Sequence, residues 1–236
     1  MLFRSGLIRI GMPVLLGGTS NHLKRDALDA VGGWDAWNVT EDADLSFRLT
    51  AGGFRIADLP SATYEEAPTT MRMWFRQRVR WKKGYLQTTI THGRKPRALF
   101  LKAGLARGLT LYGLCAGALV GSLGYPIFAA GTIAALWLNG LPEPETPEQA
   151  ALTILWLTLM FSGMVAAAAP LLLGARHRGL GQLTWWIVLV PLYYAAMSCA
   201  AWTALFEYVR APTRWNKTEH GLARSSRSGF TLGLRD

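Results

Sequence analysis

Two short motifs carry side chains that could act together on an anionic, activated substrate. They are Thr40-Glu41-Asp42 and Gln77-Arg78-Val79-Arg80-Trp81, which lie 35 residues apart and precede a long hydrophobic half. A carboxylate can take a proton from a hydroxyl, a guanidinium can bind a phosphate through two hydrogen bonds, and an indole can stack on a sugar. Followed by membrane spans, this order of residues indicates a membrane enzyme.

Asp42 lies in the first turn of an expected helix, where two interpretations compete. Thr40 is a favourable N-cap residue, and Glu41 and Asp42 complement the helix dipole, so the tripeptide alone is typical of an ordinary helix start. In the catalytic interpretation Asp42 is a general base, supported by Thr40 and Glu41. A helix start holds such a base rigidly, although the dipole is expected to lower the pKa of the carboxyl and weaken it as a base.

Gln77, Arg80 and Trp81 have the spacing of one helix face, at positions i, i+3 and i+4. This face could bind a pyrophosphate through Arg80 and a sugar or base through Trp81. The alternative is an interfacial helix, with arginines on lipid phosphates and tryptophan in the aromatic belt. The basic, tryptophan-containing helix is expected at about 69–92.

Two glycine-containing segments could add to a binding site. Gly17 to Asn21 includes Gly18, Thr19 and Ser20 but lacks the pattern of a phosphate loop, so it is a turn if taken alone. Trp34 and Asp35 place an aromatic ring beside a carboxylate, which suits a sugar, but a turn with a half-buried tryptophan explains them equally well. His22 and His92 are expected at the surface, with no metal-ligand partners at useful spacing.

Charge is distributed unevenly along the chain, and this pattern predicts its organisation. Residues 1–98 carry 15 Lys/Arg and 9 Asp/Glu, whereas residues 99–206 carry only 4 and 3. Uncharged runs of 35, 27 and 28 residues follow Arg107, Glu148 and Arg178. We expect the first run to break near Gly121 to Pro126 into spans at about 105–122 and 125–139, which makes about four helices in all. A three-span arrangement fits the basic Arg176 loop better but exports the basic tail.

The polar part is expected to alternate strands and helices. Strands are predicted at Pro13 to Gly18 and Phe54 to Leu59, and helices at Lys24 to Val31 and from about residue 41 to Ala51. The net charge of +10 lies outside the spans and favours anionic head groups or a phosphorylated substrate over nucleic acid.

The joint order of five segments resembles one family closely. Gly-Gly-Thr-Ser-Asn at 17–21, Gly-Gly-Trp-Asp at 32–35, Thr-Glu-Asp-Ala-Asp-Leu at 40–45, Tyr-Glu-Glu-Ala-Pro at 64–68 and Gln-Arg-Val-Arg-Trp at 77–81 are similar to motifs of processive, membrane-integrated family 2 glycosyltransferases, which are related to cellulose, chitin and hyaluronan synthases. The ending from Trp215 to Gly221 resembles the tail of bacterial members. The resemblance covers nearly the whole chain.

The resemblance implies an α/β fold and specific residue roles. Residues 1–98 would be the acceptor-side, C-terminal half of a GT-A catalytic domain, 99–206 an α-helical transmembrane region and 207–236 a basic cytoplasmic tail. Asp42 would deprotonate the acceptor, Arg80 would lie near the donor diphosphate, and Trp81 near the acceptor sugar. Gln77 would join them, and the segments with Gly18, Thr19, Ser20, Trp34 and Asp35 would line the acceptor site.

The resemblance also implies partners and a missing part. The reaction would be an inverting transfer from a nucleotide-sugar to a glycan or lipid-linked acceptor, on the cytoplasmic face of a multi-pass inner membrane protein in contact with lipids. Family members hold a divalent Mg or Mn ion through an earlier Asp-x-Asp motif, and none precedes Asp42. We therefore expect no metal ligands in this chain and a missing N-terminal half. The rivals are a non-catalytic truncated membrane protein that binds lipid or a partner, and a small transporter.

Overall fold

The computed structural model describes residues 2–59, 63, 65, 67–140 and 142–212, and these residues form helices and irregular segments. Within this described part no β-strand is present, so the expected α/β fold is wrong. The segments 13–18 and 54–59, where we expected strands, are irregular, and residue 18 lies in a bend. Leu16 donates its backbone N–H to Ser46 Oγ over 2.8 Å, so a helix side chain satisfies a group that a sheet ladder would otherwise pair.

The helices of the polar part begin and end close to where the sequence indicates. α2 spans Arg25–Ala30, α3 spans Glu41–Ala51 and α4 spans Met71–Gly93. Thr70 caps α4, since its side chain accepts a hydrogen bond from Met73 N at 3.2 Å. α3 ends at Gly52, and Gly53 follows with a φ of +83°, a conformation that favours glycine. These three predicted helices are confirmed.

The chain forms two compact units. One contains Met12–Leu119 together with the chain from Cys199 onward, and it holds α2, α3, α4, α5 (Pro96–Ala103), α6 (Leu105–Tyr112) and the π-helical turn Gly113–Gly117. The other contains Met1–Gly11 and Val120–Ser198, with α1 (Leu2–Arg9) and α8 (Pro147–His177). α7 (Ala118–Asn139) and α9 (Val190–Arg210) run from one unit into the other, and a 3-10 stretch, Gly181–Leu189, precedes α9.

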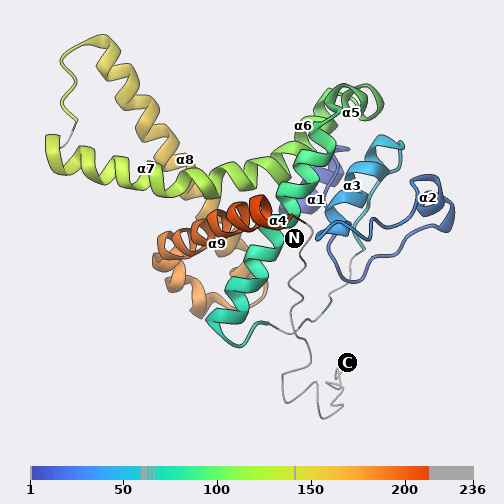
Figure 1. The fold of residues 1–236 in the computed structure, drawn as a ribbon. Coiled ribbons are helices and arrows are strands. Elements are labelled where there is room, and N and C mark those ends of the chain that lie inside the picture. The colour runs from blue at the N-terminus through green and yellow to red at the C-terminus, as the bar shows by residue number, and fades with distance from the viewer. Residues whose placement is uncertain (1, 60–62, 64, 66, 141, 213–236) are drawn as a thin grey trace. The chain divides into compact units, whose positions relative to one another are not determined.

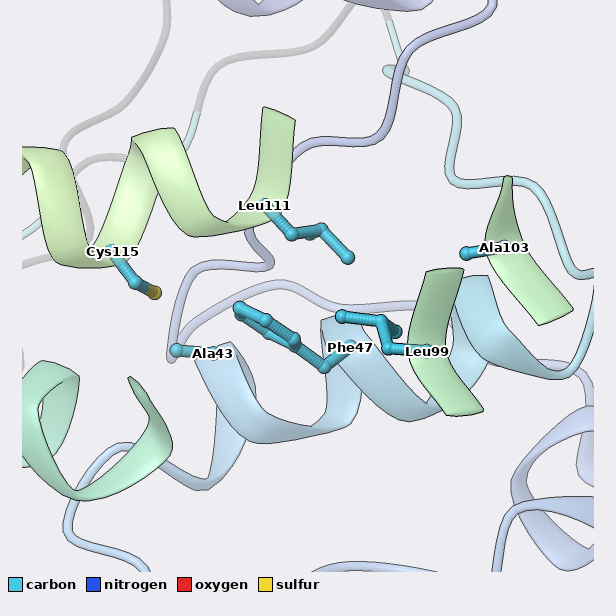
Figure 2. Packing of buried hydrophobic residues seen from close by; sticks show 6 residues of the cluster. All are labelled: Ala43, Phe47, Leu99, Ala103, Leu111 and Cys115. Carbon is cyan, nitrogen blue, oxygen red and sulfur yellow. The ribbon is translucent and has the colours of Figure 1, made fainter. Parts of the chain in front are cut away.

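The core of the first unit is centred on α3. In Figure 1, α3 lies beside the part of the molecule where α4, α5 and α6 meet, and α3 contacts both α4 and α5. Figure 2 shows Phe47 pointing from α3 into a space bordered by Leu99, Leu111 and Cys115. Phe47, Leu111 and Cys115 are completely buried. Because this face of α3 is held by apolar burial, its other faces have defined positions.

Among the residues that the structure describes, three stretches are long and apolar enough to cross a membrane: Leu105–Leu138, Pro147–His177 and Gly181–Arg210. The count differs from the expected four because the chain does not break near Gly121. Pro126 lies inside α7, so the helix continues through the expected break. A helix satisfies its own backbone hydrogen bonds, and in apolar surroundings this outweighs the one bond that a proline removes. Most of the basic tail, 213–236, lies outside the described residues.

Candidate functional site

Thr40, directly before α3, packs against Gly84 of α4, and this contact positions Asp42. Thr40 precedes the helix, but its side chain does not cap it, contrary to the expectation from sequence. The Thr40 side chain is buried, and it lies where a Cβ on Gly84 would be, since such an atom would come within 2.8 Å of Thr40 Cβ. Gly84 therefore allows the backbone of α4 to approach the residue that precedes the acidic motif.

The Asp42 carboxylate is half-buried and has two different neighbours. Oδ1 accepts a hydrogen bond from Ala43 N at 2.8 Å, while Oδ2 lies near Gly18, where an added Cβ would be 3.5 Å away. Burial raises the pKa of Asp42, Glu41 raises it further, and the Ala43 N–H and the charge of Arg80 only partly oppose the rise. The expected lowering is therefore wrong in direction, and Asp42 is a stronger base than an exposed aspartate.

α4 brings arginines and tryptophans to the same region. The charge of Arg80 opposes the rise in the pKa of Asp42, as the smallest of the causes that act on it, so these two predicted residues interact electrostatically. Arg78 places its guanidinium carbon 4.2 Å from the Trp81 ring centroid and 5.5 Å from that of Trp74. Trp81 remains 37% exposed, so one part of its ring is free to meet a ligand. Gln77 is half-buried one turn before Arg80.

Arg78 was missed as a site residue, although its spacing gives a signal. It stands four residues after Trp74 and three before Trp81, the separations at which helix side chains meet. The Nε atoms of Arg78 and Arg80 are buried and have no hydrogen-bond partner in the described part of the chain. Buried guanidinium donors are normally paired, so these two donors are unusual for the interior of a protein.

The Gly17 to Asn21 turn lies beside the acidic motif and is bonded to a distant segment. Thr19 Oγ1 donates to Glu65 Oε1, and Thr63 Oγ1 donates to Ser20 Oγ at 2.9 Å. Ser20 has a φ of +55°, which is unusual for a residue other than glycine. The structure thus brings Gly18 to Asp42, with Thr19 and Ser20 bonded to residues of the 63–65 segment. Tyr64 and Glu66 lie outside the described residues.

Trp34 and Asp35 lie in the loop between α2 and α3. Asp35 Oδ1 accepts a hydrogen bond from Trp37 N at 3.0 Å, an arrangement typical of an Asx turn. Trp34 is 44% exposed, so its ring is available for stacking. Their membership of the acceptor site stays a prediction.

The segment before α3 is bonded to α4 by buried polar side chains. Asn38 Nδ2 donates to Thr88 Oγ1 at 3.0 Å, and Asn38 Oδ1 accepts from Thr40 N at 3.0 Å. Gln87 accepts from Val39 N at 3.2 Å and donates to the Trp37 carbonyl at 2.8 Å. Apart from the local Asn38–Thr40 bond, these partners are 48 to 50 residues apart, so sequence spacing carried no signal for them. They hold the acidic motif in register with the arginines of α4.

Three further residues of α4 are more buried than their types suggest. Burial raises the pKa of Tyr85 to about 12, and the charge of Asp42 adds to the rise, so this phenol stays protonated near the carboxylate. Lys82 donates to the Ala118 carbonyl at 2.7 Å and Lys83 to the Ala211 carbonyl at 2.6 Å. These lysines attach α4 to the beginning of α7 and to the end of α9.

The Asp42-Ala43-Asp44 sequence does not make a metal site. Both carboxylate oxygens of Asp44 are engaged, one 2.8 Å from His92 Nε2 and the other 2.7 Å from Arg48 Nε. The expectation that His92 is a surface residue is wrong, since its ring also stacks on Phe47 with centroids 4.6 Å apart. Among the described residues no group of three His, Cys, Asp or Glu side chains could hold a metal ion. The divalent ion implied by the resemblance does not fit these residues.

Comparison with known proteins gives matches of one kind. The model of glycosyl transferase family group 2 matches residues 2–205. A probable glycosyltransferase, YdaM, of Bacillus subtilis is 38% identical over 68 residues, which are 28% of this chain and 16% of that protein. Beta-monoglucosyldiacylglycerol synthases of Synechocystis and Trichormus variabilis are 36% and 38% identical over 81 and 79 residues, or 34% and 33% of this chain and 17% of each relative. These alignments therefore span about a sixth of each relative. No solved structure matches the chain.

Proposed function

Because the chain belongs to glycosyl transferase family group 2, we propose that it transfers a sugar from a nucleotide-sugar to an acceptor hydroxyl at a membrane, with inversion at the anomeric carbon. The observation that carries this proposal is the half-buried Asp42 carboxylate, with its raised pKa, beside Gly18 and within the field of Arg80. A carboxylate with a raised pKa holds a proton more tightly, so it is better suited to general base catalysis.

The proposed reaction is a single displacement. Asp42 takes the proton of the acceptor hydroxyl as the acceptor oxygen forms its bond to the anomeric carbon. The bond from that carbon to the donor phosphate breaks on the opposite side, and the nucleoside diphosphate leaves with the electron pair. In this reaction the Arg80 guanidinium interacts with the departing negative charge, and the exposed part of Trp81 stacks on a sugar; the effect of Arg80 on Asp42 and the exposure of Trp81 support these roles. Asp42, Arg80 and Trp81 are supported in these roles by Thr40, Glu41 and Gln77.

The acceptor is a lipid-linked hydroxyl or a glycan. The names of two relatives, beta-monoglucosyldiacylglycerol synthases, support a lipid acceptor. The three helices of the described part that are long and apolar enough to cross a membrane support a membrane location, where such an acceptor is found. We propose a multi-pass inner membrane protein with α3 and α4 on the cytoplasmic side, in contact with lipids.

The test uses membranes that contain the protein as its own gene produces it, unchanged or with Asp42→Asn. Membranes are incubated with labelled UDP-glucose, UDP-galactose or UDP-N-acetylglucosamine, and label is measured in the lipid extract and in the retained glycan. We expect label from one donor to enter one fraction, and Asp42→Asn to abolish that entry. Asp29→Asn, on exposed α2, is the control and should behave like the unchanged protein.

Two results would contradict the proposal. Equal transfer with and without Asp42→Asn would show that another group is the base. No transfer from any donor by the unchanged protein, at levels where the protein is present in membranes, would favour the rival function of a non-catalytic membrane protein.

A further inference from the structure

An ion pair with a buried Asp44 and a partly buried Arg48, whose side chain is 23% exposed, lies on the face of α3 that does not carry Asp42. Arg48 Nε donates to Asp44 Oδ2 at 2.7 Å, and the Asp44 side chain is only 4% exposed. The same spacing of four residues occurs in the Arg25–Asp29 pair, whose side chains are 85% and 58% exposed. Surface pairs contribute little to stability, whereas removing one partner of a buried pair is costly. The Asp44–Arg48 pair therefore holds the Arg48 guanidinium in one place.

The fixed guanidinium binds the backbone of the loop that precedes Trp34. Arg48 Nη1 donates to the carbonyl oxygens of Val31 and Gly33, at 2.7 Å and 2.6 Å. Gly32 and Gly33 have φ values of +81° and +74°, in the region that favours glycine. Glycine loses more conformational freedom on folding than any other residue, so two consecutive glycines give this loop little stiffness of its own. The hydrogen bonds from Arg48 to the carbonyls of Val31 and Gly33, one on each side of Gly32, compensate for this lack of stiffness.

Asp44 also connects this arrangement to α4. His92 Nε2 lies 2.8 Å from Asp44 Oδ1, and the His92 ring stacks on Phe47. One carboxylate thus joins the end of α4, the middle of α3 and, through Arg48, the loop. Asp42 stands on the same helix two residues earlier. Any displacement of the loop relative to α3 is therefore a displacement relative to the proposed base.

We propose that Arg48, held by Asp44, is a positioning residue that sets the Trp34–Asp35 loop as a platform for the hydroxyl-bearing acceptor. This inference rests on the proposed function. The half-exposed Trp34 ring offers a stacking surface, and Asp35 is held in its turn by the Trp37 N–H. In the proposed reaction Arg80, and not this loop, interacts with the donor phosphates, so loss of the platform weakens acceptor binding and leaves the chemical step intact.

Two substitutions of Arg48 separate positioning from stability. Arg48→Lys keeps a positive charge for Asp44, but an ammonium lacks the planar fork that serves a carboxylate and two carbonyls together. Arg48→Met removes both the positive charge that pairs with Asp44 and the hydrogen bonds to the two carbonyls. We expect Arg48→Lys to raise the KM for acceptor about three- to tenfold, the equivalent of one or two lost hydrogen bonds, with kcat and the KM for donor within about twofold. Arg25→Lys, at the exposed pair, should change none of these values.

A second readout does not depend on transfer. Backbone hydrogen exchange over residues 31–37 should be faster in Arg48→Lys than in the unchanged protein, while exchange over 41–51 stays the same. Unchanged exchange over 31–37 would overturn the proposal, whether or not the protein transfers sugar. An acceptor KM that stays constant in Arg48→Lys, or a kcat that falls together with thermal stability, would also overturn it. Absence of transfer combined with faster loop exchange would contradict the proposed function alone.

Discussion

Helix α3 presents two polar faces with opposite surroundings, although the residues that form them alternate along the same two turns. Asp42 and Ser46 face the extended segment that contains Leu16 and Gly18. Asp44 and Arg48 face the 31–33 loop and His92. Burial raises the pKa of Asp42. Burial alone would also raise the pKa of Asp44, but the hydrogen bonds and charges of His92 and Arg48 lower it.

The difference between the faces shows that burial alone does not decide what a carboxylate does. Asp44 has a partner for each oxygen, so it is stable as an anion and serves the structure. Asp42 is within the field of Arg80 but has a hydrogen bond only to the adjacent backbone among the described contacts. A carboxylate in that condition can accept a proton from a ligand, so we assign chemistry to the first face and architecture to the second.

The largest effect is expected from a substitution on the first face, which carries Asp42. Asp42→Asn should lower turnover by about 100- to 10,000-fold, the range supplied by general acid–base groups. The amount of protein inserted in membranes should be unchanged, because the carboxylate supports no distant contact of the fold. Rates of label transfer in membranes matched for protein content measure the effect. Turnover close to that of the unchanged protein would remove Asp42 from the mechanism.

The next largest effect is expected from a substitution on the second face, which carries Asp44 and Arg48. Asp44→Asn should lower the free energy of unfolding by about 3 kcal/mol, since it removes the buried carboxylate and leaves the partly buried Arg48 guanidinium without its counter-charge. For a chain of this size the midpoint of thermal unfolding should fall by roughly 6–12 °C. The matched change at the exposed pair, Asp29→Asn, should cost less than about 1 kcal/mol. Equal shifts for the two variants would mean that burial of the Asp44 pair has no energetic consequence.

A smaller effect is expected at the contact between Gly84 of α4 and Thr40, which positions the first face. Gly84→Ala places a methyl group against Thr40, with its carbon 2.8 Å from Thr40 Cβ. Overpacking of this kind costs about 1–3 kcal/mol, and the shift of Thr40 should also lower turnover by displacing Asp42. Gly93→Ala, where an added Cβ has no neighbour within 4 Å, is the control on the same helix. Denaturation midpoints and turnover of both variants, measured side by side, decide whether the contact is as tight as the geometry indicates.

The smallest effect sharpens the comparison through pH. The raised pKa of Asp42 makes its charged form unfavourable in the fold, so the stability it contributes is complete below the unfolded pKa and is lost as pH rises through the folded value. Asp44 has the opposite sign, because its lowered pKa adds stability that is present above the unfolded value and is lost as pH falls through the folded one.

Asp42→Asn should therefore raise the unfolding midpoint at pH 7 and leave it unchanged at the acid end, while Asp44→Asn should lower it at pH 7. The unfolding midpoints of both variants, measured between pH 3 and pH 8, test the direction of each expected change in stability. In the same range kcat/KM of the unchanged protein should fall on the acid side with an apparent pKa above the ordinary aspartate value of about 3.9. A variant pair that shifts in the same direction at pH 7 would contradict the assignment of the faces.

Local features of the chain predicted much of what positions the site. The acidic first turn and the glycines after Ala51 mark α3, and the basic amphipathic run with its tryptophans marks α4. The prediction of strands failed because an extended segment becomes a strand only when another strand pairs with it, and Leu16 is bonded to Ser46 instead. The break expected near Gly121 failed because a glycine and proline pattern is weaker than the need of an apolar segment to satisfy its backbone.

The sequence by itself determined which residues are available for chemistry, that α3 and α4 are helices, and that long apolar segments follow them, because caps, charges and periodicity act within a few residues. Only the tertiary structure decided how Asp42 and Asp44 differ. Their neighbours come from Gly18, Arg80 and His92, which lie 24, 38 and 48 residues away in the chain. The pKa of a carboxylate depends on burial and on the charges around it, and both are set by how distant segments pack.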